Sequence, residues 1–240
     1  MKLHQLSIGY PHKVIGQNLS AQLSKASLTA LVGVNGAGKS TLLRTLTGEQ
    51  KPIAGEVLLS GKPIQSYSRG ERARQIAVVL TQRVEASQML AEEVVALGRL
   101  PYTNLMGSLK TTDLEVINQA ISITGITHLR QRQIGALSDG ERQRVMLAKA
   151  LAQETPFILM DEPTAFLDAE SRIAVLETLR ELTRTPDDMK PAVLFSTHDL
   201  HDGLKVADRV FAIGSDGLFH VSKEDDASRK ATVKTIFRDI

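Results

Sequence analysis

The stretch "SLTALVGVNGAGKSTLL" (27–43) decides the fold, because it joins three elements in a fixed order. Residues 27–33 form an uninterrupted apolar run that is typical of a buried parallel strand, and residues 40–48 have helical spacing. Between them, "GVNGAGKST" (33–41) has the glycine and Lys-Ser spacing of a Walker A phosphate-binding loop. This order of strand, glycine loop and helix predicts an α/β nucleotide-binding domain.

The residue types of the loop indicate its chemistry. Its glycines allow backbone N–H groups to converge on phosphate oxygens, and Lys39 can reach the terminal phosphates. The hydroxyl group of Ser40 can hold Mg²⁺. The predicted nucleotide-binding residues of the loop are Gly33, Asn35, Gly36, Ala37, Gly38, Lys39, Ser40 and Thr41.

Three further apolar runs predict buried strands, and segments with helical spacing lie between the runs. The runs cover 75–82, 156–162 and 192–198, and the helical segments cover 112–124, 141–153 and 169–184. This alternation is typical of a mainly parallel sheet.

Other parts of the chain do not fit the parallel sheet. The first ~25 residues and residues 55–64 predict an antiparallel side sheet, with a turn at Gly61 and Lys62. Residues 83–135 predict a helical lobe inserted into the sheet order. The charged residues 222–234 predict a solvated face or a flexible tail.

Composition excludes several classes of protein. Of the 240 residues, 42% are apolar, which is enough for a substantial core, and the absence of cysteine excludes disulfides and thiolate metal sites. The formal net charge of +2 does not favour nucleic acid as a partner. No stretch resembles a secretory signal or a spanning helix. We therefore expect a cytoplasmic protein that reaches a membrane only through a partner.

Two adjacent carboxylates end the run "FILMDE" (157–162). Consecutive side chains of a strand point in opposite directions, so the two acids can do different work. Asp161 is the candidate Walker B ligand of Mg²⁺, and Glu162 is the candidate general base or water-orienting group. Such a pair also occurs at ordinary strand ends, and the glycine loop in the same chain favours the catalytic interpretation.

Two more polar residues follow predicted strands. Gln82 can donate and accept hydrogen bonds, which suits a group that contacts both Mg²⁺ and water. His198 can donate a ring N–H group to the γ-phosphate of a nucleotide. Taken alone, Gln82 also fits an ordinary polar strand cap.

A second exposed helix start occurs in "GALSDGERQRVMLAKALA" (135–152). Ser138 and Glu141 stand three residues apart ahead of a periodic apolar pattern, which predicts a capping box. The helix end also offers donors to an anion, through the Ser138 hydroxyl group and the Gly140 N–H group. The two interpretations are compatible.

Taken together, these motifs and their order resemble an ATP-binding cassette (ABC) ATPase over nearly the whole chain. The resemblance implies that 137–141 is the signature motif, that 165–168 is the D-loop and that His198 is the switch histidine. It also implies ATP and Mg²⁺ as cofactors, and Tyr10 as the aromatic ring that stacks on adenine.

The resemblance further implies a homodimer in which two subunits face head to tail. Ser138 and Gly140 of one subunit then close over the γ-phosphate that the partner's Walker A loop holds. Asp139 departs from the family, which usually has glycine at this position, and a carboxylate near a phosphate is unfavourable unless it points away.

The implied architecture is a single domain, 1–240, with a P-loop NTPase core, an antiparallel β-subdomain and an inserted α-helical subdomain. The RecA-like core with its side sheet covers about 1–82 and 155–240, and the helical subdomain with the signature motif covers 83–154.

Within the family, "VVALGRLPYTNL" (94–105), "TAFLD" and "STHDL" resemble the ATPases of iron–siderophore, haem and cobalamin importers. This implies a polytopic permease as partner, an indirect link to a periplasmic or surface substrate-binding protein, and a place on the cytoplasmic face of the cell membrane. A soluble ABC ATPase of translation or DNA maintenance is the alternative. A P-loop kinase or GTPase is disfavoured by the signature motif.

Overall fold

Six strands form the central sheet of the computed structural model, which describes residues 1–80, 88–104, 106–184 and 190–237. The order is β10-β9-β3-β8-β7-β6, and only β10 runs antiparallel to its neighbour. The strands are β3 (Leu28–Gly33), β6 (Ile76–Val79), β7 (Phe157–Met160), β8 (Ala192–Thr197), β9 (Arg209–Ile213) and β10 (Phe219–Val221). The four strands predicted from apolar runs are confirmed, and β9 and β10 extend the sheet beyond that prediction.

The side sheet is antiparallel, as predicted, with the order β2-β1-β4-β5. It consists of β1 (Lys2–Tyr10), β2 (Lys13–Gln22), β4 (Ala54–Leu59) and β5 (Lys62–Pro63). The turn between β4 and β5 lies one residue earlier than predicted. Its central residues are Ser60 and Gly61, with φ angles of 49° and 83°, because a tight hairpin turn of this hand needs positive φ at both positions.

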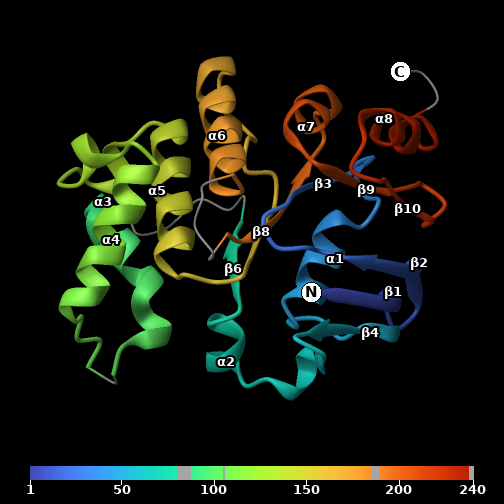
Figure 1. The fold of residues 1–240 in the computed structure, drawn as a ribbon, viewed down its shortest axis with the longest axis horizontal. Helices are drawn as coiled ribbons and strands as arrows, with labels where there is room; N and C mark the ends of the chain where they lie inside the picture. The colour runs from blue at the N-terminus through green and yellow to red at the C-terminus, as the bar shows by residue number, and fades with distance from the viewer. Residues whose placement is uncertain (81–87, 105, 185–189, 238–240) are drawn as a thin grey trace.

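The two faces of the central sheet are covered differently (Figure 1). Helix α1 (Lys39–Leu46) and the side sheet cover one face, and Leu42 and Leu46 of α1 are fully buried there. Helices from the second half of the chain cover the other face. These are α5 (Asp139–Ala152), α6 (Ala169–Leu182), α7 (Leu200–Val206) and α8 (Asp226–Lys234).

A helical layer lies at the edge of the molecule beyond β6, at the left in Figure 1. It packs its own apolar core, in which α5 takes part alongside the shorter helices. Its elements before α5 are α3 (Ala91–Ala96), η2 (Leu97–Tyr102), α4 (Thr111–Ile123), η3 (Thr127–Leu129) and η4 (Ile134–Ala136). Two short elements, η1 (Ile64–Ser66) and α2 (Arg69–Ala73), lead into β6. Among the described residues, no helix is both long and apolar enough to cross a membrane.

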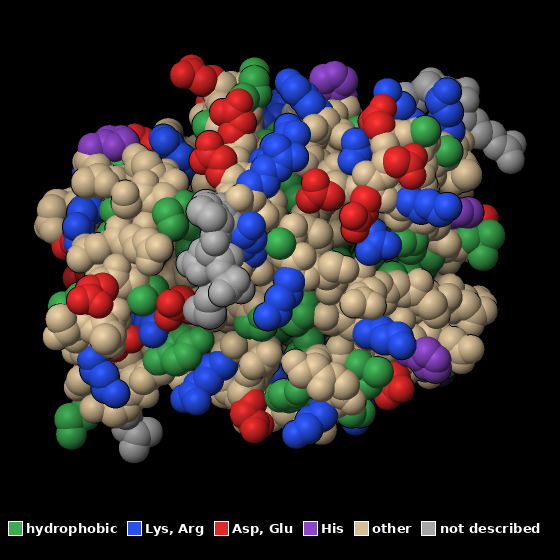
Figure 2. Space-filling model, in the orientation of Figure 1, with side chains coloured by type: hydrophobic (Ala, Val, Ile, Leu, Met, Phe, Trp, Pro, Cys, Tyr) green, Lys and Arg blue, Asp and Glu red, His purple; other side chains and the backbone are tan. Residues whose placement is uncertain are grey.

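The charged residues 222–234 do not form a flexible tail, which is one of the two alternatives predicted from the sequence. Residues 226–234 of this stretch form α8, which Asp225 caps by accepting a hydrogen bond from the Ser228 N–H group at 2.7 Å. Val233 of this helix is 2% exposed and packs in the core beneath the sheet, so the helix has one buried and one solvated side. Figure 2 shows basic and acidic side chains interspersed over the face in view, in keeping with the small net charge.

Candidate functional site

The loop after β3 has the shape of a phosphate cradle. Gly36 and Gly38 have φ angles of 81° and 105°, which glycine adopts without strain, and α1 begins immediately after Gly38. A Cβ atom on Gly38 would lie 2.3 Å from Cγ2 of Ile15 on β2, so only glycine lets the loop lie against that strand. A Cβ atom on Gly36 would meet nothing within 4 Å, so the loop is open on that side.

Lys39 stands inside the cradle. Its ammonium group donates hydrogen bonds to the carbonyl oxygens of Gly33 at 2.9 Å and Val34 at 3.5 Å, and the residue is 7% exposed. Burial lowers the pKa of Lys39, and the carboxylates of Glu162 and Asp161 oppose that shift. The other predicted loop residues lie between the end of β3 and the first turn of α1; they are Asn35, Ala37, Ser40 and Thr41.

Asp161, directly after β7, joins two elements of the site. Its Oδ2 accepts a hydrogen bond from Ser40 Oγ at 2.9 Å, and its Oδ1 accepts one from Ser196 Oγ at 2.7 Å. Ser196 lies on β8, is fully buried, and also accepts a hydrogen bond from the Glu162 N–H group at 2.8 Å. No motif in the sequence predicts this role of Ser196, because it is a single serine within a buried apolar strand.

Glu162 and His198 face each other across the edge of the sheet. His198 Nδ1 lies 3.1 Å from Glu162 Oε2, and the histidine side chain is 62% exposed. Glu162 has a φ angle of 45°, although it is not glycine and precedes Pro163. Backbone conformations of this kind cost about 1–3 kcal/mol and cluster at functional sites. In this backbone conformation the Glu162 carboxylate lies within hydrogen-bond distance of His198.

Tyr10 lies on the side sheet, apart from the contacts described above. Tyr10 ends β1 and is 47% exposed, on the hairpin whose second strand brings Ile15 against Gly38. Its exposed ring is available for stacking, and the hairpin itself adjoins the loop. Gln82 falls outside the described residues, so its predicted contacts with Mg²⁺ and water stay a prediction.

The capping box at the start of α5 is present as predicted. The Glu141 N–H group donates to Ser138 Oγ at 3.2 Å, and the Ser138 N–H group donates to Glu141 Oε2 at 2.8 Å. The hydrogen bond from the Ser138 backbone holds the pKa of the Glu141 carboxyl below its usual range. Ser138 therefore acts as a helix cap in this structure.

Arg142 forms an ion pair with Asp139, the residue that departs from the family's usual glycine. Its Nη1 lies 2.7 Å from Asp139 Oδ1, and its Nη2 donates to the carbonyl oxygen of Leu137 at 2.9 Å. The guanidinium group, which lies one helical turn after Asp139, thus neutralises the charge of the carboxylate. A carboxylate in place of the usual glycine can be accommodated here without an unpaired negative charge.

The first turn of α6 contacts two of the predicted motifs. Asp168 caps this helix, with its Oδ1 accepting a hydrogen bond from the Ser171 N–H group at 2.9 Å. Arg172 Nη1 lies 3.0 Å from Oδ2 of Asp199, the residue that follows His198 in the sequence. The sequence alone predicts no individual role for Ser171, Arg172 or Asp199.

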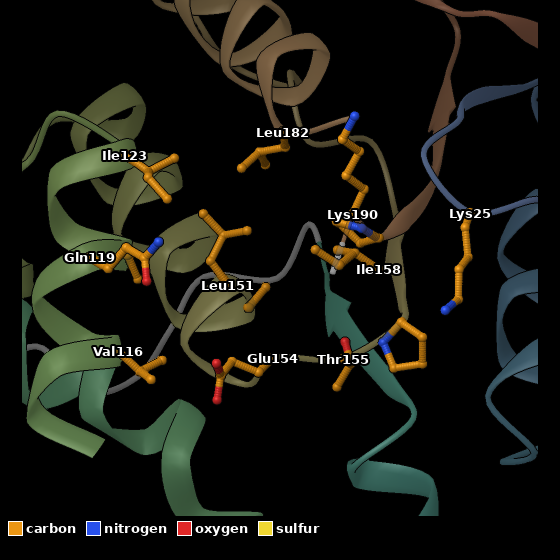
Figure 3. Close-up of a pocket in the computed structure, with 14 residues that line it drawn as sticks. Lys25, Val116, Gln119, Ile123, Leu151, Glu154, Thr155, Ile158, Leu182 and Lys190 are labelled. Atoms are coloured by element: carbon orange, nitrogen blue, oxygen red, sulfur yellow. The ribbon is translucent and has the colours of Figure 1, made fainter. Parts of the chain in front are cut away.

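A cavity of about 300 Å³ lies at the opposite edge of the sheet, where the strands begin (Figure 3). Val116 and Ile123 of α4 form one wall, Leu182 of α6 another, and Lys25 lies on the side of the sheet. Thr155, which lines the cavity, precedes β7, whereas Asp161 follows that strand. The cavity therefore does not belong to the predicted nucleotide site.

The segment whose sequence resembles the importers has a structural role. Arg99 is 6% exposed, and its guanidinium group bonds to Asp113 Oδ1 at 2.8 Å, Glu154 Oε2 at 2.6 Å and the carbonyl oxygen of Ala152 at 2.8 Å. It also stacks 4.2 Å from the ring centre of Tyr102. These contacts join η2, α4 and the end of α5.

We expect Arg99→Met to destabilise the fold strongly. The change leaves the Asp113 carboxylate buried without its cation, and breaking a buried pair in this way costs about 3–5 kcal/mol. Arg130→Met is the matched control, because Arg130 and Glu92 form a pair at 3.1 Å near the surface, which contributes about 1 kcal/mol or less. Urea denaturation measures both variants, and equal losses of stability would contradict the structural role of Arg99.

The chain is similar to known proteins across this whole arrangement. The ABC transporter family matches residues 16–165. The ferric enterobactin transport ATP-binding protein FepC of Escherichia coli (strain K12) is 39% identical over 209 residues, which cover 87% of this chain and 76% of FepC. The achromobactin transport ATP-binding protein CbrD of Dickeya dadantii (strain 3937) is 38% identical over 234 residues, or 97% of this chain and 86% of CbrD.

A solved structure has the same fold. It is assigned to the metal-chelate type of ABC transporter and has an inward-facing conformation. It is 27% identical in sequence, with a TM-score of 0.83 over 99% of this chain and 88% of that chain. The family match over more than half of the chain and the two relatives lead to one conclusion: this chain belongs to the ABC transporter family, as an ATP-binding subunit with ATPase activity.

Proposed function

We propose that this chain is the ATP-hydrolysing subunit of an importer that takes up an iron chelate, either a siderophore or haem, or cobalamin through a partner permease. The observation that carries the proposal is the similarity to FepC and CbrD, whose names state the transport of ferric enterobactin and achromobactin. A relative named as a cobalamin import protein, from Halobacterium salinarum, supports the wider class of cargo.

The cradle suits the triphosphate of ATP. Its open side at Gly36, the buried Lys39 ammonium group and the start of α1 provide donors for negatively charged oxygens. Lys39 would exchange its two carbonyl partners for phosphate oxygens, which form stronger, charge-assisted bonds. Tyr10 would offer its exposed ring to the base.

Ser40 and Asp161 suit Mg²⁺. Magnesium in nucleotide sites takes one or two side-chain oxygens together with phosphates and waters, and these two side chains already lie 2.9 Å apart. Ser196 holds the Asp161 carboxylate in place from behind. When bound there, Mg²⁺ supplies neutralisation of phosphate charge. Gln82 is a further proposed ligand.

Glu162 and His198 act on the attacking water and on the γ-phosphate of ATP. The Glu162 carboxylate accepts a hydrogen bond from the attacking water and draws its proton, while His198 donates its ring N–H group toward the γ-phosphate. Their separation of 3.1 Å lets each side chain orient the other before the nucleotide arrives. Because the acid follows Asp161 directly, one strand end sets the positions of both carboxylates.

We propose a head-to-tail homodimer as the active state. The donors of Ser138 and Gly140 at the start of α5 would serve the phosphate that the partner's cradle holds. Pairing of Asp139 with Arg142 supports this role, because it keeps the carboxylate from being an unpaired charge near that phosphate.

The permease would dock on the helical layer, within residues 87–107. Among the described residues of this segment, two large apolar side chains are exposed, Leu100 by 56% and Met106 by 91%. We place the subunit on the cytoplasmic face of the membrane, with a periplasmic or surface substrate-binding protein acting through the permease. No direct contact of this chain with the cargo is proposed.

The test uses the double variant Leu100→Glu/Met106→Glu in the complex with its permease, reconstituted in vesicles. A carboxylate added to an apolar contact should lower uptake by about tenfold or more, while basal hydrolysis by the isolated subunit stays within about twofold. The control is Leu218→Glu, because Leu218 is 53% exposed and directly precedes β10, a strand that lies away from the helical layer (Figure 1). Normal uptake by the double variant would contradict docking at residues 87–107.

Fractionation of the tagged subunit distinguishes the alternative function. An importer subunit should be purified together with a polytopic permease. Recovery with ribosomes or DNA instead would favour the soluble ABC ATPase and exclude the transport proposal.

A further inference from the structure

Gly140 packs against α6 of its own chain. A Cβ atom on Gly140 would lie 2.5 Å from Oγ and 2.7 Å from Cβ of Ser171. Separations under 3.0 Å do not occur between a real Cβ atom and its neighbours, so a side chain here would force one helix to shift. Helices α5 and α6 therefore approach each other at this point more closely than any residue but glycine allows.

Ser171 is fixed on its own side of the contact. Its N–H group donates to Asp168 Oδ1 and its hydroxyl group donates to Asp168 Oδ2, both at 2.9 Å. The hydrogen bond from the Ser171 backbone is the main cause that holds the pKa of Asp168 below its usual range, so the carboxylate stays ionised and remains an acceptor. Ser171 thus cannot turn away from Gly140 without giving up a charge-assisted hydrogen bond.

The directions of the groups on Gly140 matter for its role. The free N–H groups of a first helical turn point outward along the helix axis, where an anion would lie. The missing Cβ of Gly140 instead points sideways at Ser171. A side chain at this position would therefore meet α6 rather than a phosphate placed beyond the end of α5.

We infer that Ser171 is a positioning residue for the start of α5, and that position 140 requires glycine because of this contact within the chain. The contact sets where Ser138 stands relative to the D-loop residue Asp168. This inference rests on the proposed function in one respect only, which is the role of Ser138 toward the partner's nucleotide.

The distances define a graded rescue experiment. With Gly140→Ala alone, the new methyl group clashes with Ser171, and we expect ATP-dependent dimer closure to require at least about tenfold more ATP. Adding Ser171→Ala leaves the Cβ contact of 2.7 Å, so closure should stay impaired. Adding Ser171→Gly leaves only the Cα atom at 4.0 Å, an ordinary contact, so closure should return to within about threefold of Ser171→Gly alone.

A second measurement needs no nucleotide. The N–H groups of Glu141 and Arg142 both donate to Ser138, so their hydrogen exchange reports the first turn of α5. Exchange in the nucleotide-free subunit should be accelerated by Gly140→Ala, remain fast with Ser171→Ala added, and slow again with Ser171→Gly added. This pattern is expected even if the proposed dimer does not form.

Two results would overturn the inference. One is unchanged exchange and closure in Gly140→Ala, which would mean that a side chain fits. The other is equal impairment of Gly140→Ala with and without Ser171→Gly, which would mean that the nucleotide side requires the glycine. If the unaltered protein itself fails to close on ATP, the dimer proposal is wrong and the exchange series alone decides the role of Ser171.

Discussion

Glu162→Gln should lower the rate constant of ATP hydrolysis by about a hundredfold to ten-thousandfold while ATP affinity changes little. The amide keeps the shape of the side chain and can still form a hydrogen bond with His198, whose Nδ1 lies 3.1 Å from Glu162 Oε2 in the structure. It loses the negative charge that draws a proton from water. The substitution leaves the backbone donors of the cradle and Lys39 in place, although it removes one of the two carboxylates that oppose the lowering of the Lys39 pKa by burial.

Single-turnover hydrolysis and equilibrium binding of ATP measure the two quantities separately. Glu177→Gln is the matched control, because Glu177 is an exposed carboxylate on α6. This variant should hydrolyse ATP at the rate of the unaltered protein. A hydrolysis rate for Glu162→Gln within about threefold of the control would remove Glu162 from its catalytic role. A parallel loss of ATP affinity would point instead to a folding defect.

The second large effect concerns Lys39→Ala and Ser138→Arg, each of which should abolish ATP-dependent closure of a homodimer. Lys39→Ala removes the cation of the cradle, and Ser138→Arg fills the start of α5. In a mixed dimer, the intact Lys39 of one chain faces the intact Ser138 of the other. One complete site then returns, with charge-assisted bonds that contribute on the order of a few kcal/mol to association.

A dimer of unaltered chain and a Lys39→Ala/Ser138→Arg chain is the matched control. It carries the same two lesions, but every site between subunits then lacks one half. If Ser138 serves the partner, the dimer of single variants should close on ATP and the control should not. If Ser138 serves its own chain, only the control contains an intact site and the result is reversed. Closure of tagged, co-purified dimers is the measurement, since a single repaired site could bind ATP without completing turnover.

Local sequence patterns predicted the elements that are locally determined. The P-loop, the strands β3, β6, β7 and β8 and the capping box of α5 each have a signal within a few neighbouring residues. The short run "RVFAI" (209–213) does form β9, but its five residues between charged and glycine positions give a weaker signal than longer runs. The charges of 222–234 concealed α8, because only one side of that helix is buried.

Contacts between distant segments could not be predicted from one sequence. Ser196 supports Asp161 from another strand, and Ser171 limits the residue at position 140 from another helix. The sequence of the segment 94–105 resembles that of importer ATPases. It does not predict that Arg99 joins elements of the helical layer through hydrogen bonds to Asp113 and Ala152. Such roles depend on which segments meet in space, and that arrangement emerges only from the complete fold.

The position of β3 within the sheet has a consequence for how the chain folds. Leu28 of β3 faces Val193 of β8, and Thr29 faces Arg209 of β9, so both neighbours of the strand come from near the other end of the chain. Contacts between residues so far apart in sequence slow folding, because a long loop must close before they form. During synthesis the apolar strand that carries the P-loop must wait until β8 and β9 have left the ribosome. In that interval its unpaired edges are open to association with other chains.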